Sequence, residues 1–185
     1  MAEQKEFSFT KINLAISKEV VTHYPEGRQA SAVLPLLDLA QRQIGGWLTK
    51  EAMDYVAKTL DMAPIRVYEV ASFYTMFNLE PVGKYRIQVC GTTPCWLRGA
   101  EEIMNTCKKE LGIEKGQTTK DGMFTLTEVE CLCACVNSPV VAINDDYYED
   151  LDSKSISKII SDLKQNKKVK YGSQIGRHSS EPKED

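Results

Sequence analysis

Five of the six cysteines of this 185-residue chain fall into two short segments. The segment "CGTTPC" holds Cys90 and Cys95, and the segment "CLCAC" holds Cys131, Cys133 and Cys135. Thiolate sulfur binds zinc and iron, and it is also the nucleophile of disulfide exchange. Two groups of thiols that are distant in the sequence therefore indicate a metal or redox centre built from two loops.

The second segment offers one thiol more than a four-ligand site needs. If it curls like a helical turn, Cys131 and Cys135 share a side and Cys133 points away; if it is extended, all three share a side. Periodicity does not choose between these alternatives. The sixth cysteine, Cys107, falls on the apolar stripe of a predicted helix, where we expect a small buried apolar group and not a ligand.

Three kinds of centre use cysteines in this way. Structural zinc sites commonly place two residues between paired cysteines, and both gaps here are longer. A thioredoxin-type redox pair needs C-x-x-C after the first strand, and "CGTTPC" has two residues too many. A [2Fe-2S] cluster takes four thiolates and occurs with a four-residue gap, whereas the Rieske type also needs two histidines, and His23 and His178 lie far from the cysteines. The spacing favours a cysteine-ligated iron–sulfur cluster, with structural zinc as the alternative.

A predicted strand and helix position the first pair. In segment 80–89, apolar and polar residues alternate as in a half-buried strand, so that Cys90 falls at the strand's end. A helix follows a short loop, and its first turn holds Cys95, where free N–H groups and the positive helix end stabilise a thiolate. The buried face of this helix is predicted to carry Leu97, Ala100, Ile103, Met104, Cys107 and Leu111.

The remaining pattern predicts an α+β chain. Residues 1–80 show helical periodicity and are expected to form an N-terminal helical bundle. Residues 81–170 follow the order β-α-β-β-α, typical of a small sheet with helices packed on it. The tail, 171–185, has few groups to bury and is expected to be disordered in isolation.

Composition excludes several functions. The net charge of −3 and the pI near 5.5 argue against nucleic-acid binding. Neither a signal or transit peptide nor an apolar run of about 18 residues is present, so no direct membrane insertion is expected. The sequence also has neither a G-x-G-x-x-G nor a Walker-type loop, which predicts no NADH, flavin or nucleotide site in this chain. A cluster without a local electron donor must exchange electrons with a partner.

The segments "VGKYRIQVCGTTPCWLRGAEEI" and "EVECLCACVNSPVVAINDDYYEDL" resemble a known family. They are similar to the 24 kDa subunits of respiratory NADH:quinone oxidoreductase (complex I), which are thioredoxin-like [2Fe-2S] ferredoxins with an N-terminal helical extension. The resemblance implies one [2Fe-2S] cluster per chain with the ligands Cys90, Cys95, Cys131 and Cys135. The family usually carries glycine at the position of Cys133. We therefore expect Cys133 to be a spare thiol beside the cluster, and the alternative is a ligand that could substitute for a neighbouring cysteine.

The resemblance also implies a role. The cluster would exchange electrons with FMN in a partner flavoprotein of the 51 kDa type, which binds FMN and NADH, within the peripheral arm of complex I. This chain would hold no independent catalytic site and would lie on the cytoplasmic side of a bacterial inner membrane, or on the matrix side in a mitochondrion. The alternatives are the equivalent diaphorase subunit of an NAD-linked hydrogenase or formate dehydrogenase, a structural zinc-binding interaction module, and a free-standing ferredoxin.

Overall fold

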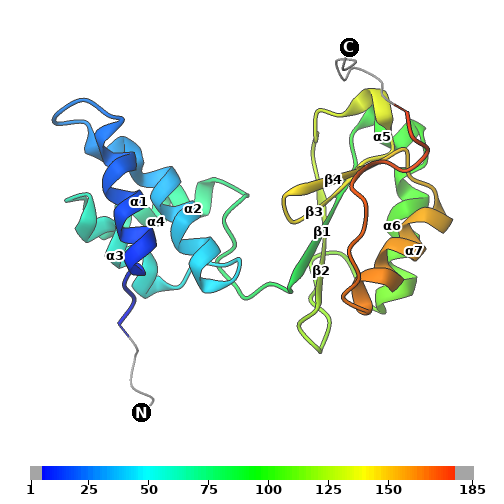
Figure 1. Cartoon of the computed structure of the whole chain (residues 1–185), viewed down its shortest axis with the longest axis horizontal. Coiled ribbons are helices and arrows are strands. Elements are labelled where there is room, and N and C mark those ends of the chain that lie inside the picture. Colours follow the sequence, from blue (N-terminus) through cyan, green and yellow to red (C-terminus); the bar gives the residue numbers. More distant parts are fainter. Residues whose placement is uncertain (1–5, 178–185) are drawn as a thin grey trace. The chain divides into compact units, whose positions relative to one another are not determined.

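The computed structural model describes residues 6–177 (Figure 1). The chain divides into two compact units between Val82 and Gly83. Whether the predicted segments 1–80 and 81–170 fold as independent domains stays a prediction. Within residues 6–177, no helix combines the length and the apolar character needed to cross a membrane.

The first unit is a helical bundle, as predicted. Its elements are α1 (Lys11–Thr22), a 3-10 turn (Gln29–Ala32), α2 (Val33–Ile44), α3 (Lys50–Thr59) and α4 (Pro64–Phe73). The Thr49 side chain caps α3 by accepting a hydrogen bond from the Ala52 N–H, and Pro64 starts α4. The fully buried core of the unit includes Leu36, Leu37, Ala40, Leu48, Val56 and Val67.

The second unit is a mixed five-stranded sheet with helices, which confirms the predicted α+β class. Its strands are β1 (Tyr85–Cys90), β2 (Phe124–Val129), β3 (Val141–Ile143), β4 (Asp146–Glu149) and β5 (Gly172–Ser173), in the order β2-β1-β3-β4-β5. Its helices are α5 (Thr93–Leu97), α6 (Ala100–Leu111) and α7 (Ser153–Lys164).

Strand β1 is central and pairs in parallel with β2 and antiparallel with β3. Helices α5 and α6 make the crossover that a parallel pair requires. Figure 1 shows α6 and α7 side by side, and their apolar faces join the strands in one core. That core contains Ile87, Ile103, Leu126, Ile156 and Ile160, all essentially inaccessible to solvent.

Several features depart from the sequence-based predictions. Leu97, predicted on the buried face of a helix, is 70% exposed, because it ends the short helix α5 and does not belong to the apolar face of α6. The predicted order β-α-β-β-α also lacks strand β4, which pairs antiparallel with β3.

The single helix predicted after Cys90 is two helices, because Gly99 adopts a left-handed conformation (φ +98°) between α5 and α6. The tail expected to be disordered begins with an ordered segment: β5 pairs in parallel with β4, and the chain stays hydrogen-bonded as far as Arg177. Disorder is therefore wrong for residues 172–177, whereas residues 178–185, including His178, lie outside the described part.

Core truncation provides a test of this packing. Leu126→Ala removes a fully buried side chain of β2 from the core that the sheet shares with the helices and should lower the free energy of unfolding by about 2–5 kcal/mol. Leu97→Ala changes a side chain that is 70% exposed and should alter it by less than about 0.5 kcal/mol. Urea unfolding of both variants measures the difference, and equal midpoints would contradict the assigned core.

Candidate metal centre

The parallel pairing of β1 and β2 brings the two cysteine segments to one edge of the sheet. Cys90, the last residue of β1, lies in register with Val129, the last residue of β2. Because parallel strands run in the same direction, the residues that follow them emerge at the same edge. Cys131 follows Val129 by two positions, so it emerges close to Cys90 although the two cysteines are distant in the sequence.

The first pair lies in a small apolar pocket. Cys90 and Cys95 are each only 1% exposed and pack with Ala100 and Val140. Cys90 Sγ lies 3.3 Å from the Thr92 hydroxyl oxygen and donates to the Glu130 carbonyl at 3.1 Å. Helix α5 supplies Cys95, which confirms that this residue lies in the first turn of a helix.

The second pair lies on a curled, exposed loop. Cys131 Sγ and Cys135 Sγ are 4.0 Å apart, and a 3-10 turn begins at Cys135. Cys133 has a left-handed backbone (φ +60°), and its N–H donates to Cys131 Sγ at 3.3 Å. The sequence left open a curled or an extended loop, and the structure has the curled one. A left-handed conformation costs a non-glycine residue about 1–2 kcal/mol, whereas glycine adopts it freely.

In each pair, the pKa of one thiol is lowered from its ordinary value and the pKa of the other is raised. Burial alone would raise the pKa of Cys90, but hydrogen bonds from Thr92 and the Leu132 amide outweigh it and leave that pKa below its usual value. The pKa of Cys95 is raised, mainly by burial and then by Cys90.

The same division holds in the second pair. The Cys133 N–H lowers the pKa of Cys131, and the hydrogen bond with Cys131 raises the pKa of Cys135. Without a metal, Cys90 and Cys131 therefore lose a proton more readily than their partners, and binding through four thiolates releases the protons that the thiols still carry.

The donor set fits a binuclear iron–sulfur cluster. Each iron of a [2Fe-2S] cluster takes two thiolates, and the four cysteines form two close pairs on two segments that meet at one edge. Within residues 6–177, no three His, Cys, Asp or Glu side chains converge closely enough to bind one metal ion.

The sequence did not predict that the Glu128 side chain lies close to Gly91, beside the first cysteine pair. A Cβ atom on Gly91 would clash with the Glu128 carboxylate, so a larger residue at this position would have to displace that side chain. Glu128 is itself paired with Lys115 at 2.6 Å. The only sequence signal for Glu128 was a charged residue near the end of a predicted strand, which is too common to single out.

A small mixed sheet with two cysteine pairs at one edge defines a thiolate-ligated metalloprotein of the thioredoxin-like type. Residues 17–164 match the family of thioredoxin-like [2Fe-2S] ferredoxins. The chain belongs to this family, and its cofactor is a [2Fe-2S] cluster.

Relatives agree with this assignment over most of the chain. It is 60% identical to the E subunit of NADH-quinone oxidoreductase from Rickettsia bellii over 158 residues, which cover 85% of this chain and 95% of that protein. It is 52% identical to "NADH dehydrogenase [ubiquinone] flavoprotein 2, mitochondrial" of Dictyostelium discoideum, over 97% of this chain and 72% of that protein.

A solved structure shares the fold. An NAD+-reducing [NiFe]-hydrogenase superposes with a TM-score of 0.65 at 21% identity, over 73% of this chain. This chain spans only 23% of that hydrogenase chain.

The sixth cysteine, Cys107, provides a test of which thiols are buried in the core and which are accessible. Cys107 is inaccessible on α6, as predicted, and burial raises its pKa to about 12, so it stays a neutral thiol throughout the neutral pH range. In the cluster-free chain at a mildly alkaline pH, iodoacetamide should modify Cys131, Cys133 and Cys135 while leaving Cys107 unmodified until urea is added. Peptide mass spectrometry measures this, and rapid modification of Cys107 in the folded chain would contradict its place in the core.

Proposed function

We propose that this chain is the electron-transfer subunit of an NADH:quinone oxidoreductase (complex I). Its near full-length similarity to the Rickettsia subunit of such an enzyme is the observation that carries the proposal. The chain itself makes and breaks no substrate bond, and a partner of the 51 kDa type binds NADH and FMN. The assembly would lie at the cytoplasmic face of a bacterial inner membrane, as part of its peripheral arm.

The proposed cluster ligands are Cys90, Cys95, Cys131 and Cys135. Their arrangement in two close pairs supports this assignment, and so does the left-handed backbone of Cys133, which brings its N–H to the Cys131 sulfur. Cys133 is then a hydrogen-bond donor to a ligand sulfur through its backbone.

The cluster, when bound, accepts and returns single electrons. The chain contributes hydrogen bonds that stabilise negative charge on the ligand sulfurs: the Thr92 hydroxyl lies 3.3 Å from Cys90 Sγ, and the Cys133 N–H donates to Cys131 Sγ. Such bonds favour the more negative, reduced state and so raise the reduction potential. Burial of Cys90 and Cys95 excludes water from one side of the centre.

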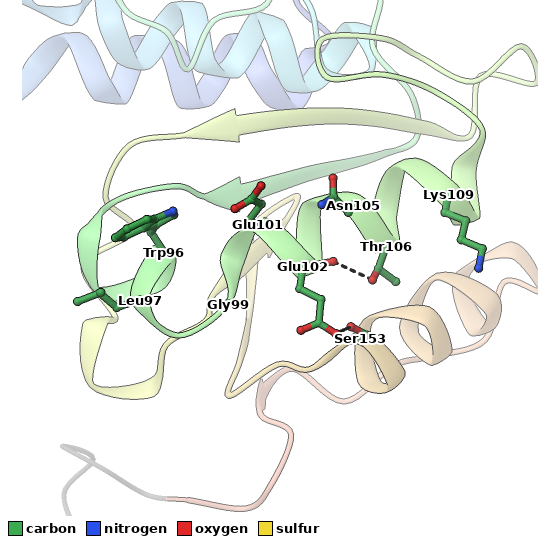
Figure 2. Close-up of a pocket in the computed structure, with 9 residues that line it drawn as sticks. All are labelled: Trp96, Leu97, Gly99, Glu101, Glu102, Asn105, Thr106, Lys109 and Ser153. Atoms are coloured by element: carbon green, nitrogen blue, oxygen red, sulfur yellow. Dashed lines mark hydrogen bonds between the residues drawn. The ribbon is translucent and has the colours of Figure 1, made fainter.

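Exposed apolar side chains flank the cysteines and support a partner-binding surface there. Trp96 and Leu97 on α5 are 59% and 70% exposed, and Val136, the residue after Cys135, is 63% exposed. Trp96 and Leu97 line an open groove of about 700 Å³ beside α6. Figure 2 shows these two side chains at one end of the lining and Lys109 of α6 at the other. Exposed apolar residues that lie together in one patch, as Trp96 and Leu97 do, typically mark protein contacts. A flavoprotein bound here would bring its flavin close to the cluster, as electron transfer requires.

A diaphorase subunit of an NAD-reducing hydrogenase is the second candidate. The fold shared with the [NiFe]-hydrogenase favours it, but the identity of 21% is far below the 60% shared with the Rickettsia protein. Co-purification from the native organism distinguishes the two, since the partners would be quinone-reducing subunits in one case and a nickel-containing subunit in the other.

The ligand assignment predicts different results for two cysteines. Cys95→Ser should abolish or severely reduce cluster assembly, because a serine oxygen binds iron less well than a thiolate, whereas Cys133→Ala should retain the cluster. Iron, acid-labile sulfide and zinc, with an EPR spectrum after reduction, measure the outcome on the anaerobically purified chain. Equal cluster loss in both variants would contradict the ligand set, and zinc without sulfide in the unmodified chain would contradict the function.

The partner surface predicts a selective loss of binding. Leu97→Asp should weaken association with the flavoprotein at least about tenfold, since a charge in a buried apolar contact is costly, while the iron content stays unchanged. Tyr147→Asp, a matched change of a partly exposed residue on β4, should leave binding intact. Titration calorimetry with the purified flavoprotein compares the two, and equal affinities would place the contact elsewhere.

A further inference from the structure

We propose that Arg177 is a positioning residue that holds the second cysteine loop, residues 131–138, in its ligand-binding conformation. This inference rests on the proposed function, because it takes Cys131 and Cys135 as cluster ligands. Arg177 belongs to the tail, residues 171–185, which the sequence analysis expected to be disordered in isolation.

Arg177 bonds directly to the backbone beside a proposed ligand. Its Nη2 donates to the Val136 carbonyl at 2.6 Å. Val136 immediately follows Cys135, so this bond restrains the Val136–Asn137 peptide, one residue beyond one of the two sulfurs 4.0 Å apart. A shift of that peptide would change the separation between Cys131 Sγ and Cys135 Sγ.

Arg177 is in turn fixed by a carboxylate with almost no access to water. The Asp150 side chain is only 4% exposed and forms an ion pair with the Arg177 guanidinium. Ser173 links the two residues, because its hydroxyl donates to Asp150 Oδ2 at 2.7 Å and accepts from the Arg177 N–H at 3.0 Å. The Arg177 side chain is itself 41% exposed, so its orientation is limited mainly by the hydrogen bonds to the buried carboxylate and to Val136.

The backbone of Asp150 also binds the next residue of the loop, Asn137. The Asp150 N–H donates to the Asn137 carbonyl at 2.7 Å. Two consecutive peptides after Cys135 are therefore tied to one point, the first through Arg177 and the second through the Asp150 backbone. Strand β5 completes this frame by pairing with β4, which places the tail beside the loop.

The bonding pattern requires arginine in particular. Its planar guanidinium has five N–H donors in a fixed fork and here bonds both Asp150 and the Val136 carbonyl. A lysine ammonium at the end of a flexible stem reproduces the charge but not this fixed geometry. A substitution that retains the charge should therefore restore the loop only in part.

The test compares Arg177→Ala and Arg177→Lys with Lys164→Ala in the full chain. Lys164 also donates from a cationic side chain to a backbone carbonyl, that of Glu110, and is the matched control. Arg177→Ala should release iron to a chelator about tenfold faster or more and should change the EPR g values of the reduced cluster. Arg177→Lys should fall between, and Lys164→Ala should match the unmodified chain. Release rates and g values unchanged in Arg177→Ala would overturn the proposal.

A double variant separates the loss of loop positioning from the effect of leaving the buried Asp150 carboxylate without its partner. In Asp150→Asn with Arg177→Ala, no unpaired carboxylate remains, but the bond to Val136 is still missing. The proposal expects fast iron release and altered g values to persist in the double variant, and full recovery would overturn it. If instead the unmodified chain assembles no iron and sulfide, the proposed function fails; if it assembles them and only the Arg177 effects are absent, the function stands without this inference.

Discussion

The parallel register between β1 and β2 is the constraint on which the rest of the second unit depends. It places the end of β1, with Cys90, beside the end of β2, from which the loop carrying Cys131 and Cys135 departs. A parallel pair needs a long crossover, and here α5 and α6 provide it while also carrying Cys95. Burial of Ile87 on β1 and Leu126 on β2 specifies the register, because a one-residue slip of either strand would turn the buried side chain of that strand out of the core.

The two cysteine pairs are surrounded differently, and the difference suits an electron carrier. Cys90 and Cys95 are buried beside Ala100 and Val140, whereas Cys131 and Cys135 lie on an exposed loop. One side of the centre is thus shielded from water, while the other is open to a partner from which electrons can come. Hydrogen bonds from Thr92 and the Cys133 amide stabilise negative charge on one sulfur of each pair, so this stabilisation is present in both the buried and the exposed pair.

The exposed loop lacks the packing that fixes the buried pair, and it gains its support from hydrogen bonds over a long sequence distance. Asp150 and Arg177 bind its backbone at Asn137 and Val136. The tail therefore belongs to the architecture of the site as far as Arg177. This arrangement explains how a loop with a left-handed residue at Cys133 keeps two sulfurs 4.0 Å apart.

Local patterns in the sequence determined the bundle, the strand that ends at Cys90 and the burial of Cys107, because each depends on neighbours a few residues away. The similarity of the cysteine segments to a known family added the cofactor. Only the tertiary structure decided that the loop at Cys133 curls, that Glu128 covers Gly91, and that Arg177 reaches Val136 across 41 residues. These contacts follow from strand register and chain crossover, which bring distant segments together and leave no periodic trace in the sequence.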